Sequence, residues 1–97
     1  MGRLLEKMGA PFRRPEWSAL ALMEQPDAVT KAHNLYIEAG CDIITTNTYA
    51  LVPFHIGEER WRNQANDLIT LAAKLARECA DQSKRDIKVA GCIPPVF

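Results

Sequence analysis

Apolar residues recur at every third or fourth position in two long segments of the chain. The stripe in the first segment consists of Ala28, Ala32, Leu35 and Ala39. This spacing is typical of a helix with one buried face, and Pro26 and Gly40 suit its start and its end. The stripe in the second segment consists of Trp61, Ala65, Leu68, Ala72, Leu75 and Cys79. It predicts a longer helix from Glu58 to about Asp81.

Two shorter apolar segments lack this spacing and predict strands. The segment 42–49 begins apolar and ends in hydroxyl and amide side chains, and the segment 87–93 stops at Pro94. A long helix joins them, so we expect a parallel, right-handed strand–helix–strand unit. Ligands of such α/β proteins bind at the carboxyl ends of the strands. The polar end of the first strand is therefore the candidate binding site.

The remaining segments predict little regular structure. Residues 4–8 could form one or two helical turns, and residues 17–23 a short helix, with prolines interrupting the chain between them. Residues 50–57 are expected to form a loop. Because two parallel strands cannot bury both faces of a sheet, the predicted order of helix, strand, helix and strand indicates part of a larger α/β domain.

Composition and charge exclude several classes of protein. The chain has 12 basic and 12 acidic side chains, which gives no electrostatic footprint for nucleic acid. No apolar run reaches the roughly 18–20 residues that a membrane span needs. The three cysteines are an odd number without a CxxC pair. This pattern argues against a disulfide framework and for a reducing, cytoplasmic setting.

Three ordered motifs, at 17–19, 39–50 and 89–95, resemble the homocysteine S-methyltransferase family. Met1–Leu5 also resembles the end of the family's first-strand motif. The resemblance implies a (β/α)8 barrel that holds homocysteine and zinc at the carboxyl ends of its strands. Residues 1–97 would be the N-terminal portion of this barrel, without the start of strand 1 and without the later strands.

The same resemblance implies which residues bind substrate. Thr46, Asn47 and Tyr49 are similar to positions lining the homocysteine pocket, and Trp17 to a loop residue that can cover the substrate. Alternatively, the first three bond neighbouring loops, and Trp17 is a packing anchor, which is the interpretation we favour for it. His55 is a weak catalytic candidate in a loop on the same side.

No catalytic residue and no metal ligand are assigned within the sequence. The acidic substrate-site residue of the family would precede Met1, and its three zinc cysteines belong to later strands. Cys41 begins a strand and Cys92 ends one, so more than about 20 Å is expected between them. Cys79 is predicted to be a buried apolar residue, and His33, beside the apolar stripe of its helix, to be structural or solvated.

The resemblance implies transfer of a methyl group from a small donor to a zinc-bound homocysteine thiolate, which gives methionine. The isolated chain is expected to be inactive, because the metal-binding part is absent. A non-catalytic barrel fragment and another (β/α)8 enzyme are the alternatives. The methyl donor and the oligomeric state are left open by the sequence.

Overall fold

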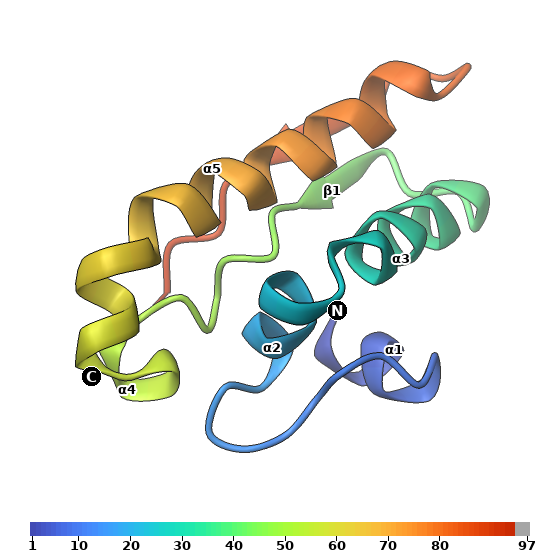
Figure 1. The fold of residues 1–97 in the computed structure, drawn as a ribbon. Coiled ribbons are helices and arrows are strands. Elements are labelled where there is room, and N and C mark those ends of the chain that lie inside the picture. Colours follow the sequence, from blue (N-terminus) through green and yellow to red (C-terminus); the bar gives the residue numbers. More distant parts are fainter. Residues whose placement is uncertain (95–97) are drawn as a thin grey trace.

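The computed structural model describes residues 1–94, which form five helices and two strands (Figure 1). In chain order they are α1 (Gly2–Lys7), α2 (Ser18–Glu24), α3 (Pro26–Glu38), β1 (Ile43–Thr45), α4 (Pro53–Ile56), α5 (Glu58–Gln82) and β2 (Lys88–Ala90). The two long helices and the two strands are confirmed. The fold is of the mixed α/β kind, and closure into a barrel stays an expectation.

The two strands pair in parallel, with Ile44 opposite Val89, and the long helix α5 connects them. Both regular strands are shorter than predicted, since β1 ends at Thr45 and β2 at Ala90. The backbone N–H of Thr46 still donates to the carbonyl of Ala90, at 2.9 Å. Beyond that point side-chain hydroxyls replace the backbone in joining the two segments, so the regular ladder stops.

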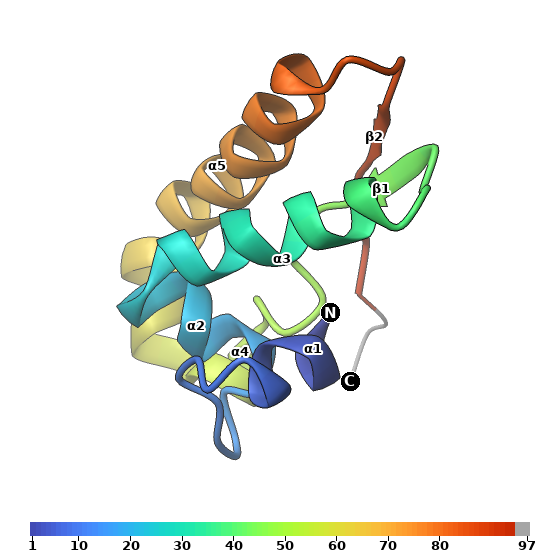
Figure 2. The same cartoon turned by 90° about the vertical axis from the view of Figure 1, so that its right-hand side faces the viewer.

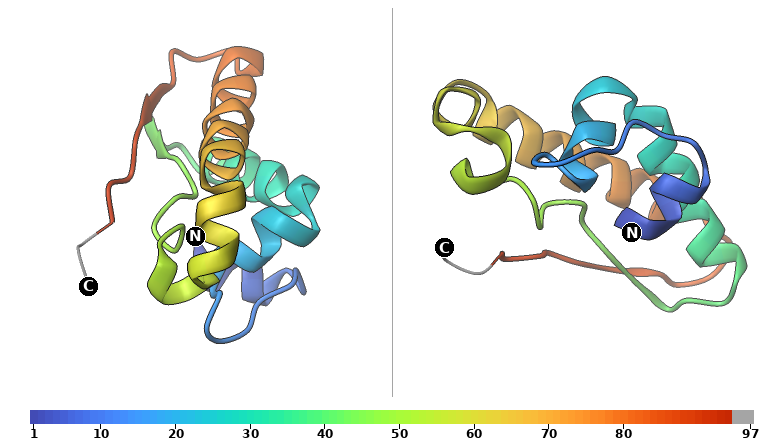
Figure 3. Two further views of the ribbon diagram at one scale, coloured as in Figure 1. Left: turned by 60° about the vertical axis from the view of Figure 1, so that its left-hand side comes forward. Right: turned by 90° about the horizontal axis from the view of Figure 1, so that it is seen from below.

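Helices α3 and α5 lie on one side of the two-stranded sheet (Figure 3). The small core between them and the sheet consists of Ile44, Ala76, Cys79, Ala80 and Ile87. Cys79 belongs to the predicted stripe of α5, and Ala76 and Ala80 lie beside it on the same helix. Ile44 lies in β1, and Ile87 precedes β2. On the other side of the sheet Ile43 is 57% exposed. One face of the sheet is therefore covered, and the other is accessible in this structure.

A larger core lies below the sheet, where α1, α2 and α4 gather around α3 and the first half of α5 (Figure 2). Leu5, Leu22 and Val29 are fully buried there. The loop predicted at 50–57 contains the single turn α4, which begins at Pro53. Proline suits a first helical position, but one turn is too short to show a periodic pattern.

The entry into β1 is fixed by Arg85, which precedes the second strand. Its guanidinium donates hydrogen bonds to the carbonyls of Ile37 and Cys41, and it pairs with Asp42 at 3.2 Å. Ile37 belongs to the last turn of α3, where carbonyls lack helical partners. Arg85 thus satisfies the end of α3 and ties the two strand starts together. No helix within residues 1–94 is both long and apolar enough to cross a bilayer.

Candidate functional site at the strand ends

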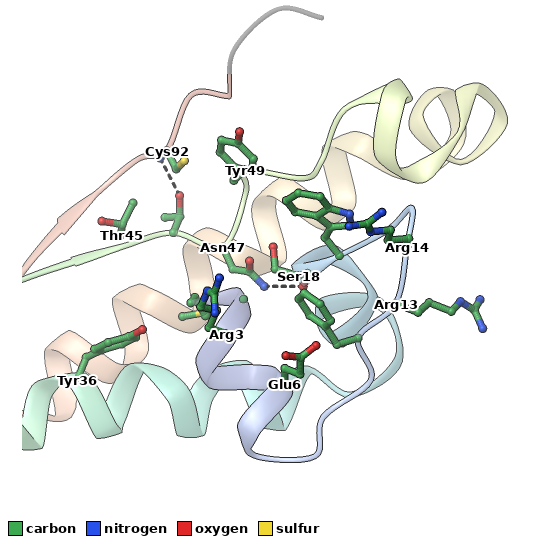
Figure 4. Close-up of a pocket in the computed structure, with 15 residues that line it drawn as sticks. Arg3, Glu6, Arg13, Arg14, Ser18, Tyr36, Thr45, Asn47, Tyr49 and Cys92 are labelled. Carbon is green, nitrogen blue, oxygen red and sulfur yellow. Dashed lines mark hydrogen bonds between the residues drawn. The ribbon is translucent and has the colours of Figure 1, made fainter.

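A cavity of about 1000 Å³ opens beyond the carboxyl ends of the two strands (Figure 4). Its walls come from α1, from the loop before α2 and the start of α2, from α3, from the end of β1 and from the segment after β2. All four residues that the resemblance implied line it: Trp17, Thr46, Asn47 and Tyr49. The sequence reasoning did not assign Arg3, Ser18 or Cys92, which line it as well. Arg3 lies in the Met1–Leu5 motif, and this motif was the one feature of the sequence that could have indicated Arg3 as a cavity residue.

Thr46, Thr48 and the backbone of Cys92 form a closed ring of hydrogen bonds. The N–H of Cys92 donates to the Thr46 hydroxyl at 3.1 Å, and the Thr48 hydroxyl donates to the Cys92 carbonyl at 2.6 Å. The two hydroxyls lie 3.0 Å apart. Because Thr48 has only one hydroxyl hydrogen, Thr46 must donate to Thr48. The Thr46 hydroxyl therefore has only an acceptor position left for a ligand.

Asn47 connects the end of β1 to the start of α2. Its side-chain Nδ2 donates to the carbonyl of Ser18 at 3.1 Å, and the residue is buried (Figure 4). This bond fixes the orientation of the amide, because the nitrogen must face the carbonyl. The Oδ1 atom takes no part in it and is an acceptor of the kind that an amino-acid ammonium group needs.

An aromatic cluster stands at one end of the cavity, around the buried His55. The ring centroids of Trp17, Phe54 and Tyr49 lie 5.2, 5.1 and 6.4 Å from that of His55. Trp17 and Tyr49 are both roughly 40% exposed, at 41% and 43%. They offer open ring surface to the cavity, whereas His55 is 4% exposed. The imidazole packs against these rings and does not line the cavity.

Trp17 has a backbone φ of +50°, which is uncommon for a residue with a side chain. Such conformations cost on the order of 1–3 kcal/mol and persist where the surroundings impose them. The preceding residue, Glu16, is buried and pairs with Arg13 at 3.2 Å and with Arg60 at 3.7 Å. Burial alone would raise the pKa of Glu16, but its own backbone N–H and the two arginines outweigh burial and lower it. The ion pairs of Glu16 thus hold the loop directly before Trp17, the residue with the unfavourable backbone conformation.

The described residues provide no metal site. No cluster of three or more His, Cys, Asp or Glu side chains occurs within 1–94 that could hold an ion. Cys79 is buried under α3, whereas Cys41 and Cys92 are partly exposed at opposite ends of the sheet. Zinc, which the family resemblance implies, therefore does not fit the donor groups in this part of the chain.

The fold and cavity define a mixed α/β protein with a cavity at the carboxyl ends of two parallel strands, which is where many enzymes of this class bind their ligands. The family model for homocysteine S-methyltransferase matches residues 1–97. The chain belongs to this family, and the family resemblance is confirmed.

Several curated plant proteins are similar to the chain. Homocysteine S-methyltransferase 1 of Zea mays is 38% identical over 79 residues, which are 80% of this chain and 24% of that protein. Homocysteine S-methyltransferase 1 of Arabidopsis thaliana is 33% identical over 89 residues, 90% of this chain and 27% of that protein. The chain therefore spans about a quarter of the length of these relatives. No solved structure matches the chain significantly.

Proposed function

We propose that this chain contributes the amino-acid-binding wall of a homocysteine S-methyltransferase. The observation that carries the proposal is the convergence of Asn47, Tyr49 and Trp17 on one cavity at the strand ends, in a chain of this family. In this proposal β1 and β2 are neighbouring strands of a (β/α)8 barrel, in the reducing, cytoplasmic setting that the cysteines favour.

The polar groups of the cavity suit the α-amino acid end of homocysteine. The Oδ1 of Asn47 would accept a hydrogen bond from the ammonium group, and the Thr46 hydroxyl, which also lines the cavity, has one acceptor position left. Arg3 extends from α1 toward Asn47 and would attract the carboxylate (Figure 4).

In the proposed reaction the homocysteine thiol loses its proton, and the thiolate attacks the methyl carbon of a donor. A sulfur–carbon bond forms, the bond between the methyl group and the donor breaks, and its electron pair leaves with the donor. Methionine is the product. Zinc, which holds and activates the thiol in the family, would need ligands from outside the residues described, so this chain alone would be inactive.

The aromatic rings at the cavity favour one kind of donor. The open faces of Trp17 and Tyr49 attract cations through their π-systems, which suits sulfonium or quaternary ammonium donors such as S-methylmethionine, S-adenosylmethionine or a betaine. A methylfolate carries no such cation at its methyl group. We therefore favour an onium donor over a folate.

Binding of L-homocysteine to the purified chain tests the proposal. Titration followed by amide chemical shifts should perturb residues 46–49. Asn47→Ala should abolish the response, and Asn63→Ala should not, because Asn63 is exposed on α5. A wild-type chain without any such response would contradict the proposed function. Formation of methionine by the isolated, zinc-loaded chain would contradict the proposed inactivity.

A second function is favoured by the accessible face of the sheet. Ile43 is 57% exposed there, and in the part of the chain that the structure describes each strand pairs along only one edge. Open edges promote association between chains. A non-catalytic association module would therefore self-associate in light scattering over a concentration series, and a strictly monomeric chain would count against it.

A further inference from the structure

His55 contacts the side chains that frame the cavity, although it is not one of the residues that line it. The imidazole lies 5.2 Å from the Trp17 ring at an interplanar angle of 41°, and 6.4 Å from the Tyr49 ring at 37°. Phe54 meets the same imidazole edge-on, at 86°. These contacts leave His55 only 4% exposed. His55 therefore contacts the rings of Trp17 and Tyr49, both of which line the cavity, without lining it itself.

The same side chain also holds the backbone next to Trp17. Its Nδ1 lies 3.0 Å from the carbonyl oxygen of Pro15. A carbonyl can only accept a hydrogen bond, so Nδ1 carries the hydrogen and donates it. Pro15 is therefore tied through its carbonyl, Glu16 through its ion pair with Arg60, and Trp17 through its ring contact. Three consecutive residues are each held by a group from α4 or α5.

We propose that His55 is a positioning residue, which fixes the Trp17 indole at the cavity so that its face meets the ligand. The ring contact sets the plane of the indole, and the bond to Pro15 imposes the unusual backbone conformation of Trp17. The identity of the ligand rests on the proposed function above, but the placement of Trp17 does not. Binding groups act fully only when they are held in a productive geometry.

A role of His55 as a general acid or base fits these contacts poorly. Such a group must reach a proton on the substrate directly or through one water. Nδ1 is already bonded to Pro15, the ring is covered by aromatic side chains, and the residue does not line the cavity. The geometry therefore points to support of Trp17 and Tyr49 rather than to proton transfer.

Quenching of Trp17 fluorescence by acrylamide tests the proposal without any ligand. The experiment uses the full chain with Trp61→Phe, which leaves Trp17 as its only tryptophan. His55→Ala should raise the quenching constant at least about twofold, because the indole loses its support. His55→Asn should restore part of the protection, since the Asn amide nitrogen can donate to Pro15 from nearly the position of Nδ1. Equal quenching in the wild-type background and in His55→Ala would overturn the proposal.

Two controls separate positioning from general stability. Phe54→Ala removes the edge-on contact to His55 but keeps the imidazole and its bond to Pro15, so quenching should rise much less than with His55→Ala. Ile87→Val weakens the distant core beneath α5 and should lower the urea midpoint without changing the quenching. A rise in quenching with Ile87→Val equal to that with His55→Ala would reduce His55 to a structural residue and overturn the proposal.

A ligand titration then connects the position of Trp17 to binding. Tetramethylammonium serves as the onium probe, and His55→Ala should weaken its effect on Trp17 fluorescence at least fivefold, with partial recovery in His55→Asn. If the probe does not bind the wild-type chain, the preference for an onium donor fails, while the acrylamide result still decides whether His55 positions Trp17. If it binds wild type and His55→Ala equally, the link between positioning and binding is overturned.

Discussion

The hydroxyl of Thr48 donates a hydrogen bond of 2.6 Å to the backbone carbonyl of Cys92, which lies 44 positions later in the chain. The N–H of the same Cys92 donates to Thr46, so that one residue after β2 is held by two threonines after β1. Side chains thereby continue the parallel pairing past the point where the backbone ladder stops. Both strand ends, and the cavity wall between them, are fixed by this ring.

Thr48→Val should destabilise the chain by about 1–2 kcal/mol. The substitution removes the hydroxyl, breaks the ring, and leaves the partly buried Cys92 carbonyl without its partner. Urea unfolding should show this loss, and Thr48→Ser should restore most of the stability because it keeps the hydroxyl. Thr70→Val, on the exposed side of α5, is the matched control. A similar loss of stability in Thr70→Val and Thr48→Val would contradict the stabilising role of the hydrogen-bonded ring.

The sequence predicted the long helices well, because a stripe that continues for many turns has few alternative explanations. It placed the end of the first strand at 49, which is wrong, since β1 ends at Thr45. The reason is the bond between Thr46 and Cys92, two residues that are far apart in the chain. Local patterns of apolar and polar residues carry no information about such a contact.

The candidate site was predicted in part for a similar reason. Asn47 and Tyr49 were found because they follow a strand in a motif, and strand ends meet at one edge of a sheet. Arg3 was missed because α1 is a helix of six residues, whose place beside the cavity depends on packing rather than on its own pattern. The support of Trp17 by His55 likewise depends on two loops meeting in space.

Arg60→Ala should destabilise the chain by about 1 kcal/mol, and Arg62→Ala by less than about 0.5 kcal/mol. The two arginines are neighbours on α5, but Arg60 pairs with the buried Glu16, whereas Arg62 pairs with the exposed Glu58. Exposed pairs are screened by water and contribute little, while a buried carboxylate that loses a cation stays desolvated. Urea unfolding of both variants at pH 7 measures the difference. A larger loss in Arg62→Ala than in Arg60→Ala would refute this interpretation.

The three thiols should react with a disulfide reagent at different rates. Cys79 is buried, its Sγ lies 3.6 Å from the carbonyl of Thr30, and burial together with Glu78 raises the pKa of its thiol. Because the thiolate is the reactive form, Cys79 should react only when urea unfolds the chain. Cys41 and Cys92 are partly exposed and should react in the folded state. The reaction should therefore show a fast phase from Cys41 and Cys92 and a slow phase from Cys79. Cys79→Ser should remove only the slow phase, and a slow phase that persists in this variant would identify another thiol as the protected one.

A ligand in the cavity should slow one of the two fast thiols. Cys92 lines the cavity, whereas Cys41 lies before β1 at the opposite end of the sheet. L-Methionine resembles homocysteine but has no free thiol to react with the reagent. Saturating L-methionine should slow Cys92, measured in Cys41→Ser, without affecting Cys41, measured in Cys92→Ser. Equal protection of both thiols, or none, would mean that methionine does not occupy this cavity.

The stability of the chain should fall as the pH decreases from 6.5 toward 4, because of His33. This side chain is fully buried in α3, and within residues 1–94 neither ring nitrogen has a hydrogen-bond partner. Burial, with a smaller effect of the N-terminal amine, lowers the pKa of His33 from 6.5 to about 4. Between these values the unfolded chain binds a proton that the folded chain does not, so acid favours unfolding.

His33→Leu removes this titration and tests it. The pKa difference of 6.5 against about 4 corresponds to a loss of about 3 kcal/mol when the wild-type chain is brought from pH 7 to pH 4. Urea unfolding of His33→Leu should vary much less over this range. Glu16 affects stability in a different pH range. Its pKa is lowered from 4.5, so the stability that its ionised carboxylate contributes is lost only below about pH 4.5. A wild-type chain as stable at pH 5 as at pH 7, or a variant with the same slope, would show that His33 does not control this part of the profile.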